Sequence, residues 1–99
     1  MPLIRYNGEY CHFLSTISDT HNFAIAVRIM QKGPMTHAIL KEEIGLSDAK
    51  LKKHLNQLLF CSYLFSKKKG KEITYYLNHT TVRPLIKIMN RHIGKYQVK

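Results

Sequence analysis

The residues best suited to chemistry in this chain lie between Ser47 and Gln57. Successive residues of a helix are rotated by about 100°, so a helical wheel sorts this stretch into two sides. With Leu51 on the buried side, Leu55 and Leu58 lie close beside it. The opposite side carries Ala49, Lys50, Lys53, Asn56 and Gln57. This side is mostly polar, and its charges are all positive.

Each of these side-chain types has a partner in the major groove of DNA. Lysine can donate to guanine or to phosphate, asparagine and glutamine can pair with adenine edges, and alanine can sit against a thymine methyl. Asp48 suits the positive end of the helix, and it could accept from a cytosine amino group or repel a phosphate. A charged, solvated side is also normal for any surface helix, so the pattern alone leaves that alternative open.

The charge around this helix favours a polyanionic partner, either nucleic acid or an anionic membrane surface. Residues 47–71 hold seven lysines against one acid, Asp48, and so carry +6 of the +10 net charge. A second basic run follows the helix and contains Lys67, Lys68, Lys69 and Lys71. The longest apolar run, Phe23 to Val27, is far shorter than the roughly 20 residues that span a bilayer. The N-terminus has no secretory segment, so we expect a cytoplasmic protein without a membrane partner.

Apolar residues at helical spacing predict four helices before the second basic run. The first covers about residues 9–18, and the second ends at Gly33-Pro34, because proline cannot continue a helix. Thr36 can cap a short third helix, and Gly45 can adopt the left-handed conformation that ends it. Ser47 can cap the fourth helix, which carries the cationic side.

The last third of the chain predicts a hairpin and a final helix. The segments YLFS and EITYYL are rich in β-branched and aromatic residues and flank the polar KKKGK, which favours a β-hairpin. The final helix, to about residue 96, opens at Thr80 or Thr81 with Pro84 inside its first turn. No linker or repeat interrupts these elements, so residues 1–99 form a single domain. The predicted fold class is mainly α with a small β-hairpin, with about five helices and two strands.

Several segments together resemble one family of DNA-binding proteins. The stretch GPMT…LKEEIGLSDAKLKKHLNQLLFCSYLFSKKKGKEITYYL is similar to the winged helix-turn-helix of the arsenic-repressor (ArsR/SmtB) family. Sequences of that family often read G-P-L-T, then L-G-L-S-x-x-x-V-S-x-H-L, then a basic hairpin ending Y-Y-x-L. The match from Ile44 to Leu55 needs no gap, and it retains Gly45, Leu46, Ser47, His54 and Leu55. SDTHNF also resembles the family's A-D-P-T-R, with Asn22 in place of arginine, and the resemblance covers about residues 14–93.

The resemblance implies which elements contact double-stranded DNA. The recognition helix would be Leu46 to Phe60, and the wing would be residues 67–71. The predicted recognition-helix contacts are Ser47, Asp48, Ala49, Lys50, Lys53, His54, Asn56 and Gln57, and the wing contacts are Lys67, Lys68, Lys69 and Lys71. His54 could contact a phosphate or pack inside the protein. Thr36 and His37 could touch the DNA backbone, although Thr36 could also serve only as a cap.

The first and last helices each carry an apolar side that the small central motif cannot cover. In the resembled family such helices pair across a two-fold axis, so we expect a homodimer built on the helices at about 9–18 and 81–96. The predicted interface residues are Tyr10, Phe13, Leu14, Leu85, Ile86, Met89 and Ile93. Two recognition helices would then meet successive major grooves, about 34–36 Å apart, on a palindromic site.

Candidate metal ligands are few. Many members of the resembled family release DNA when metal binds, through cysteines at the first helix of the motif or through Asp and His on the last helix. The segment Met35 to Leu40 has no cysteine. Only His79 and His92 occupy places resembling the second ligand set, while Thr81 and Lys95 stand at the other two. Two imidazoles are too few for a closed tetrahedral zinc site, so we expect no metal and assign no effector ligand.

The sequence contains no catalytic motif, neither a G-x-S-x-G elbow, a Walker loop nor H-E-x-x-H, so we expect no enzyme and no cofactor. Cys11 and Cys61 are expected to be reduced thiols, with a redox pair as the alternative. The leading hypothesis is a homodimeric, sequence-preferring, double-stranded DNA-binding transcriptional regulator. One alternative is a non-specific nucleic-acid-binding or architectural protein of the same fold, because lysine lacks the bidentate fork of arginine. Another is a module whose basic face meets an acidic protein.

Overall fold

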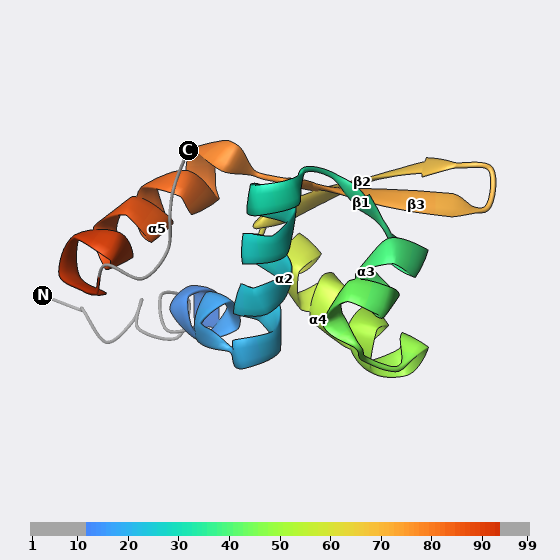
Figure 1. Cartoon of the computed structure of the whole chain (residues 1–99), viewed down its shortest axis with the longest axis horizontal. Helices are drawn as coiled ribbons and strands as arrows, with labels where there is room; N and C mark the ends of the chain where they lie inside the picture. Colours follow the sequence, from blue (N-terminus) through green and yellow to red (C-terminus); the bar gives the residue numbers. More distant parts are fainter. Residues whose placement is uncertain (1–11, 94–99) are drawn as a thin grey trace, which may run out of the picture.

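The computed structural model describes residues 12–93 (Figure 1). Within that range lie five helices: residues 12–18, α2 (Thr20–Lys32), α3 (His37–Ile44), α4 (Asp48–Phe60) and α5 (His79–Ile93). The strands are β1 (Met35–Thr36), β2 (Leu64–Lys69) and β3 (Glu72–Leu77). The predicted mainly α fold with a hairpin is confirmed, and the short strand β1 is an addition to it. None of the described helices combines the length and the apolar character needed to cross a bilayer.

The helix ends around the motif are those that the sequence predicts. Thr36 caps α3 and Ser47 caps α4, each with a side-chain oxygen that accepts from a backbone N–H three residues on, at 3.3 Å. Gly45 ends α3 with φ of 78°, a left-handed conformation that glycine adopts without strain. The observed helix α4 therefore begins at Asp48 rather than at Leu46, and a short turn joins it to α3.

The sheet has the order β1-β3-β2, and both pairings are antiparallel. In the hairpin, Leu64 lies opposite Leu77 at the base and Lys69 opposite Glu72 at the tip. This register leaves a two-residue turn that begins at Gly70, whose φ is 64°. In Figure 1 the hairpin projects away from the helices, and α5 lies at the other end of the molecule. The predicted wing is thus present, and most of its lysines lie in strand β2 rather than in the turn.

The core fixes α4 along its apolar side. Leu51, Leu55 and Leu58 are each at most 1% exposed, as the helical wheel predicts. Tyr63, just after the helix, is also buried, and its hydroxyl donates to the backbone oxygen of Phe13 at 2.6 Å. The centroids of these two rings are 4.6 Å apart. The buried leucines, together with the contacts of Tyr63 just after the helix, therefore hold α4 in place. Its polar side faces outward.

Helix α5 differs from the prediction at its start. It begins at His79, one or two residues early, and the N–H of Val82 donates to the oxygen of Asn78 at 2.9 Å. Pro84 is therefore the sixth residue of the helix and lies past the first turn. An ordinary residue there would donate its N–H to the carbonyl of Thr80, which proline cannot do. The prediction that Pro84 lies in the first turn is wrong because the helix begins earlier.

Candidate nucleic-acid interface

The polar side of α4 is exposed at four of its predicted contact positions. These are Ala49, Lys50, Lys53 and Asn56, and none of them packs into the core. Ser47 is exposed as well, although its hydroxyl is occupied as the helix cap. Their exposure follows from the buried leucine stripe on the opposite side of the helix. Two cations, one amide and one methyl group therefore face solvent together.

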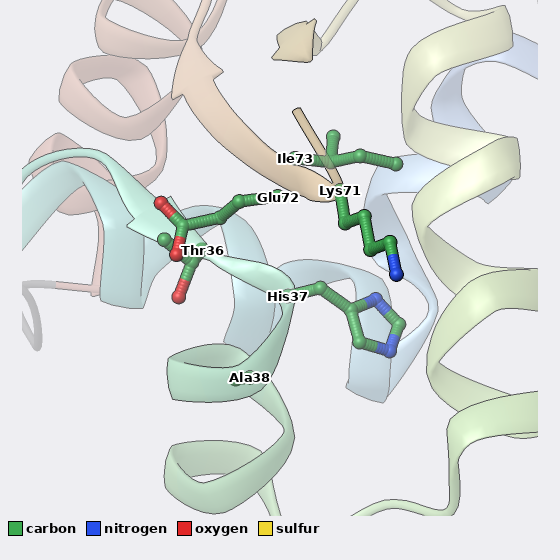
Figure 2. A pocket seen from close by; sticks show the side chains of 6 residues that line it. All are labelled: Thr36, His37, Ala38, Lys71, Glu72 and Ile73. Atoms are coloured by element: carbon green, nitrogen blue, oxygen red, sulfur yellow. The ribbon is translucent and has the colours of Figure 1, made fainter. Parts of the chain in front are cut away.

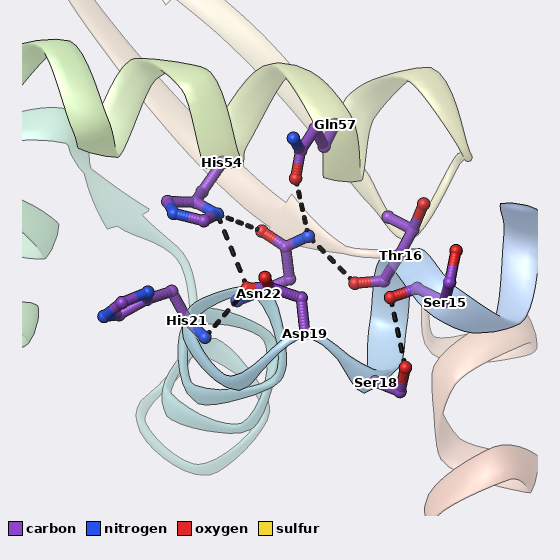
Figure 3. A network of polar contacts seen from close by, with 8 residues as sticks. All are labelled: Ser15, Thr16, Ser18, Asp19, His21, Asn22, His54 and Gln57. Carbon is purple, nitrogen blue, oxygen red and sulfur yellow. Dashed lines mark hydrogen bonds and ion pairs between the residues drawn. The ribbon is translucent and has the colours of Figure 1, made fainter.

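Two other predicted contacts turn toward α2 instead (Figure 3). Gln57 Oε1 accepts from Asn22 Nδ2 at 2.9 Å, and His54 Nδ1 lies 2.8 Å from Asn22 Oδ1. His54 is 9% exposed and Asn22 is fully buried. For His54, the packing alternative is therefore the observed one. For Gln57, the bond to Asn22 occupies Oε1, so pairing with an adenine edge through both amide atoms would require that bond to break, and its contact with a base stays a prediction.

The network fixes the proton on the ring of His54. Asn22 Nδ2 also donates to the backbone oxygen of Thr16 at 2.8 Å. Because a carbonyl oxygen only accepts, the amide orientation is settled, and Oδ1 must be the atom that faces His54. Nδ1 of His54 therefore carries hydrogen and donates. The other nitrogen of the neutral ring, Nε2, keeps its lone pair.

Burial lowers the pKa of His54 below its ordinary value, and the carboxylate of Asp19, 3.6 Å from Nδ1, opposes the shift. We expect NMR titration to show the Nδ1–H tautomer and a midpoint below about 6.5. Asp19→Asn, which can still cap α2, should lower the midpoint further, because it removes the contribution that raises the pKa. A midpoint at or above the ordinary value, or an increase in Asp19→Asn, would contradict this account.

The lowered pKa of His54 also makes the free energy of unfolding depend on pH. A depressed pKa means that the unfolded chain takes up this proton at a higher pH than the folded chain. The contribution of neutral His54 to the free energy of unfolding is therefore fully present above its ordinary pKa. It is lost as the pH falls through that value toward the lower folded-state pKa.

The acid at the start of α4 is tied to α3. Asp48 Oδ2 accepts from Lys41 Nζ at 3.1 Å, and Oδ1 lies 3.2 Å from His37 Nε2. The hydrogen bond from Lys41, followed by that from His37, holds the pKa of Asp48 below its usual range. Asp48 is therefore an ionised partner for α3, and the nearby cation reduces its repulsion of a phosphate. Contact with a cytosine would have to compete with these bonds.

A groove of about 450 Å³ connects the wing to the start of α3 (Figure 2). Its lining residues are Thr36, His37, Ala38, Lys71, Glu72 and Ile73. Lys71 comes from the turn of the hairpin, whereas His37 opens α3 and is also bonded to Asp48 at the start of α4. The hairpin turn, the start of α3 and the start of α4 are therefore neighbours on one surface. Thr36 takes part in this groove, with its hydroxyl engaged as the cap of α3.

The wing lysines are all exposed, but they divide between the two faces of the hairpin. Side chains alternate along a strand, so Lys67 and Lys69 share one face and Lys68 lies on the other. Lys67 Nζ lies 5.8 Å from the ring centroid of Tyr76, on the first face. Lys68 lies opposite Ile73, which shares its face of the hairpin with the buried Tyr75 and Leu77. Lys68 is therefore on the side of the hairpin that turns toward the helices.

The predicted dimer interface is only partly within the described range. Tyr10 lies outside it, and nothing of the Ile93 side chain is described. Ile86 is 1% exposed and belongs to the core of the chain itself, so it leaves no surface for a second copy. Leu14 is 55% exposed, and Ile88, which the sequence analysis did not select, is 52% exposed. The half-buried members are Phe13, Leu85 and Met89.

The two histidines that resembled part of a metal-ligand set lie apart. His79 opens α5 and His92 is thirteen positions later (92 − 79), about 20 Å along the axis at 1.5 Å per residue. They cannot share an ion within one chain. Cys61 is half-buried, with Sγ 3.4 Å from the hydroxyl of Thr16. Cys11 lies outside the described residues, so the expectation of two reduced thiols, with a redox pair as the alternative, stays a prediction.

A cluster that the sequence analysis missed adjoins the network of Figure 3. Asp19, His21 and His54 each offer a possible ligand atom, and these atoms lie within 4.8 Å of one another. The rings of the two histidines have centroids 5.0 Å apart. Asp19 and His21 stand at the start of α2, whereas His54 comes from the middle of α4. Only the packing of α2 on α4 joins them, and the local Asp-x-His spacing is too common to predict a site.

The chain matches no family model and no curated protein sequence. Similar solved structures include NolR from Sinorhizobium fredii, with a TM-score of 0.81 and 20% identity over 97% of this chain and 96% of that one. The transcriptional repressor BigR from Xylella fastidiosa has a TM-score of 0.74 and 19% identity over 96% and 95%. An ArsR-like transcriptional regulator from Rhodococcus sp. RHA1 has a TM-score of 0.65 and 24% identity over 88% and 83%. The fold of this chain is therefore the winged helix-turn-helix of ArsR-like proteins.

Proposed function

We propose that this chain is a DNA-binding transcription regulator that prefers particular duplex sequences. The observation that carries the proposal is the groove that joins the hairpin turn to the start of α3, together with the bond from His37 to Asp48, which brings the start of α4 beside it. The charge of these elements suits a polyanion, and the exposed lysine and asparagine side chains of α4 suit base edges. BigR is described as a transcriptional repressor, and its similar fold supports the proposed class.

In this proposal α4 lies in the major groove and the wing lies on the DNA backbone. Lys50, Lys53 and Asn56 approach base edges, and Ala49 allows close approach near the helix start. Gln57 and His54 act through the protein instead, since their bonds to Asn22 set how α4 sits on α2. His37 is placed to meet a phosphate at the mouth of the groove shared with Lys71.

The proposal includes a homodimer, supported by apolar surface on the first and last helices. Leu14 and Ile88 are each more than half exposed, although their side chains are large and apolar. A second copy that covers them would remove this surface from water, which is favourable at about 25 cal/mol per Å². Two recognition helices would then read two half-sites related by a dyad.

The function is tested by selecting bound duplexes from a random pool. We expect enrichment of a motif with two dyad-related half-sites whose centres lie about 10–10.5 base pairs apart. The enriched duplex should resist competition by random duplex. If random duplex competes equally well, the non-specific architectural alternative is correct. If no duplex binds at moderate salt, the basic face serves an acidic protein instead.

The wing makes a separate prediction about salt dependence. Lys71 lines the groove beside α3, and Lys68 lies opposite Ile73 in the hairpin, so alanine at both positions should weaken binding to every duplex. The slope of log K against log salt is negative, and each lost phosphate contact reduces its magnitude by about 0.9, so the pair should reduce the magnitude by up to about 1.8. Anisotropy titrations over a series of salt concentrations measure this slope.

The matched control is alanine at Lys67 and Lys69, which removes the same charge from the opposite face of the hairpin. A smaller change in slope is expected for this pair. If the control loses as much slope as Lys68 and Lys71, or more, the proposed orientation of the wing is wrong.

A further inference from the structure

We propose that the outer face of the hairpin binds single-stranded DNA, with an unpaired base stacked on Phe65 and the neighbouring phosphates held by Lys67 and Lys69. The outer face is the side of β2 and β3 that carries Phe65, Lys67, Lys69, Thr74 and Tyr76. Phe65 lies opposite Tyr76 and Lys67 opposite Thr74, and side chains alternate along each strand, so these residues share one side of the sheet. None of the five is among the residues that line the groove beside α3.

The outer face is open because the other face of the hairpin packs on the core. Leu64, Tyr75 and Leu77 lie on that inner face, and each is at most 6% exposed. Phe65 is 53% exposed, although its side chain is a large apolar ring. In Figure 1 the hairpin projects away from the helices. A strand of nucleic acid can therefore reach this face without displacing any part of the core.

The combination of a ring and two cations selects the ligand. A single exposed phenylalanine is common on protein surfaces and indicates no ligand by itself. Here Lys67 and Lys69 follow Phe65 on the same face, about 7 and 13 Å further along the strand at 3.3 Å per residue. Proteins that bind single strands combine aromatic side chains, on which bases stack, with a row of cations along the phosphates. The outer face carries both groups side by side.

Tyr76 positions one of the two cations. The Nζ atom of Lys67 lies over the ring of Tyr76, 5.8 Å from its centroid. The attraction between an ammonium group and an aromatic ring holds this lysine beside the hairpin. The ring of Tyr76 is half-buried and has the lysine over it, so the base stacks on Phe65 instead.

One acid, Glu72, is opposite Lys69 at the tip of the hairpin. Glu72 lines the groove together with Thr36 of β1, and Figure 2 shows its carboxylate pointing toward Thr36. Strands β1 and β2 flank β3 on opposite sides. The carboxylate is therefore turned away from β2, and the lysines of β2 remain available to phosphates.

Stacking on Phe65 requires an unpaired base, because in a duplex the neighbouring base pairs cover both faces of each base. None of the proposed contacts is made to the sugar, so RNA, which differs by its 2′-hydroxyl, should bind no more tightly than DNA. The inference does not depend on the proposed regulator function, because binding to a single strand is measured without duplex. Either one can fail while the other stands.

The experiment measures the anisotropy of a labelled strand of about 12 thymidine nucleotides, a length within the range bound by known single-strand sites, titrated with the full chain. Phe65→Leu should lower the affinity at least about fivefold, because leucine keeps the apolar surface but has no ring for a base to stack on. Phe65→Tyr keeps a ring and should retain the affinity. The position is exposed, so both variants should fold.

The two cations have their own measurement. Alanine at Lys67 and Lys69 should reduce the magnitude of the salt slope on the single strand by up to about 1.4, at about 0.7 for each phosphate contact. Alanine at Lys68 and Lys71 should reduce it less. This order is the reverse of the one expected on duplex, so the two pairs distinguish the two faces of the hairpin.

The matched control for the ring is Phe60→Leu. Phe60 is 81% exposed and ends α4, so its replacement should leave the affinity for the single strand unchanged. Unchanged affinity in Phe65→Leu, an equal loss in Phe60→Leu, or tighter binding of an RNA strand of the same length overturns the proposal. Sedimentation of the same variants gives a further check. If Phe65→Leu dissociates a dimer, a second copy covers the outer face, and this too overturns the proposal.

Discussion

Alanine at both Lys50 and Lys53 is expected to weaken binding to the selected duplex about 30-fold or more, with a much smaller loss on scrambled duplex. A specific base contact contributes about 1–3 kcal/mol of discrimination, and lysine, which lacks a bidentate fork, belongs at the lower end. Two such contacts give about 2 kcal/mol, and each 1.4 kcal/mol is a tenfold change. Anisotropy titrations of both duplexes at one salt concentration measure the two losses.

The control for this pair is Lys52→Ala. Lys52 is also exposed, but it lies about 100° around the helix from Lys53. The substitution Lys52→Ala removes one positive charge without removing a base contact. Any loss of affinity should therefore be similar on both duplexes. If Lys50 and Lys53 also lose equally on every duplex, they contact phosphates only, and the sequence-preferring regulator gives way to the non-specific alternative.

Asn22→Ala is expected to lower the free energy of unfolding by about 2–4 kcal/mol, because buried polar groups left without partners cost about 1–3 kcal/mol each. Asn22 is 0% exposed, and its amide serves three partners within 2.9 Å. Truncation to alanine removes the hydrogen-bond partner of the Thr16 carbonyl and of the His54 Nδ1–H. The loss should therefore be among the largest of any single polar substitution in the described range.

Urea unfolding measures this loss, and Asn56→Ala is the matched control. Asn56 is the same residue type on the exposed side of α4, so its replacement should change the free energy of unfolding by no more than about 0.5 kcal/mol. A loss below about 1 kcal/mol in Asn22→Ala would mean that water replaces the missing amide and that the network does not hold α4 to α2.

The parts of the fold that sequence predicts well are those set by local physics. Thr36 and Ser47 were identifiable as caps because a short polar side chain before an apolar helix satisfies the first free N–H groups. Gly45 was identifiable because glycine adopts the left-handed conformation without strain. The leucine stripe of α4 follows from helical periodicity alone. These signals also predicted that Ala49, Lys50, Lys53 and Asn56 lie on the exposed side of α4.

The parts that could not be predicted depend on neighbours distant in sequence. A helical wheel gives the angle of Gln57 and His54 but not the identity of the surface beside them, which is the buried amide of Asn22. Strand β1 has two residues and exists only through its pairing with β3. The start of α5 was misplaced because threonine is a good cap residue, yet Asn78 accepts the first bonds of the helix.

Strand β2 has a further consequence for any work on the wing lysines. In the described part of the chain it pairs only with β3, so one side of its backbone is an open sheet edge. Phe65 on this strand is 53% exposed, and an open edge with an apolar side chain is a template for pairing with other chains. The lysines of β2 disfavour such pairing, because the positive charges on two molecules repel each other. Neutralising all of them, by mutation or by acetylation, would therefore promote aggregation at the same time as it removed the charge.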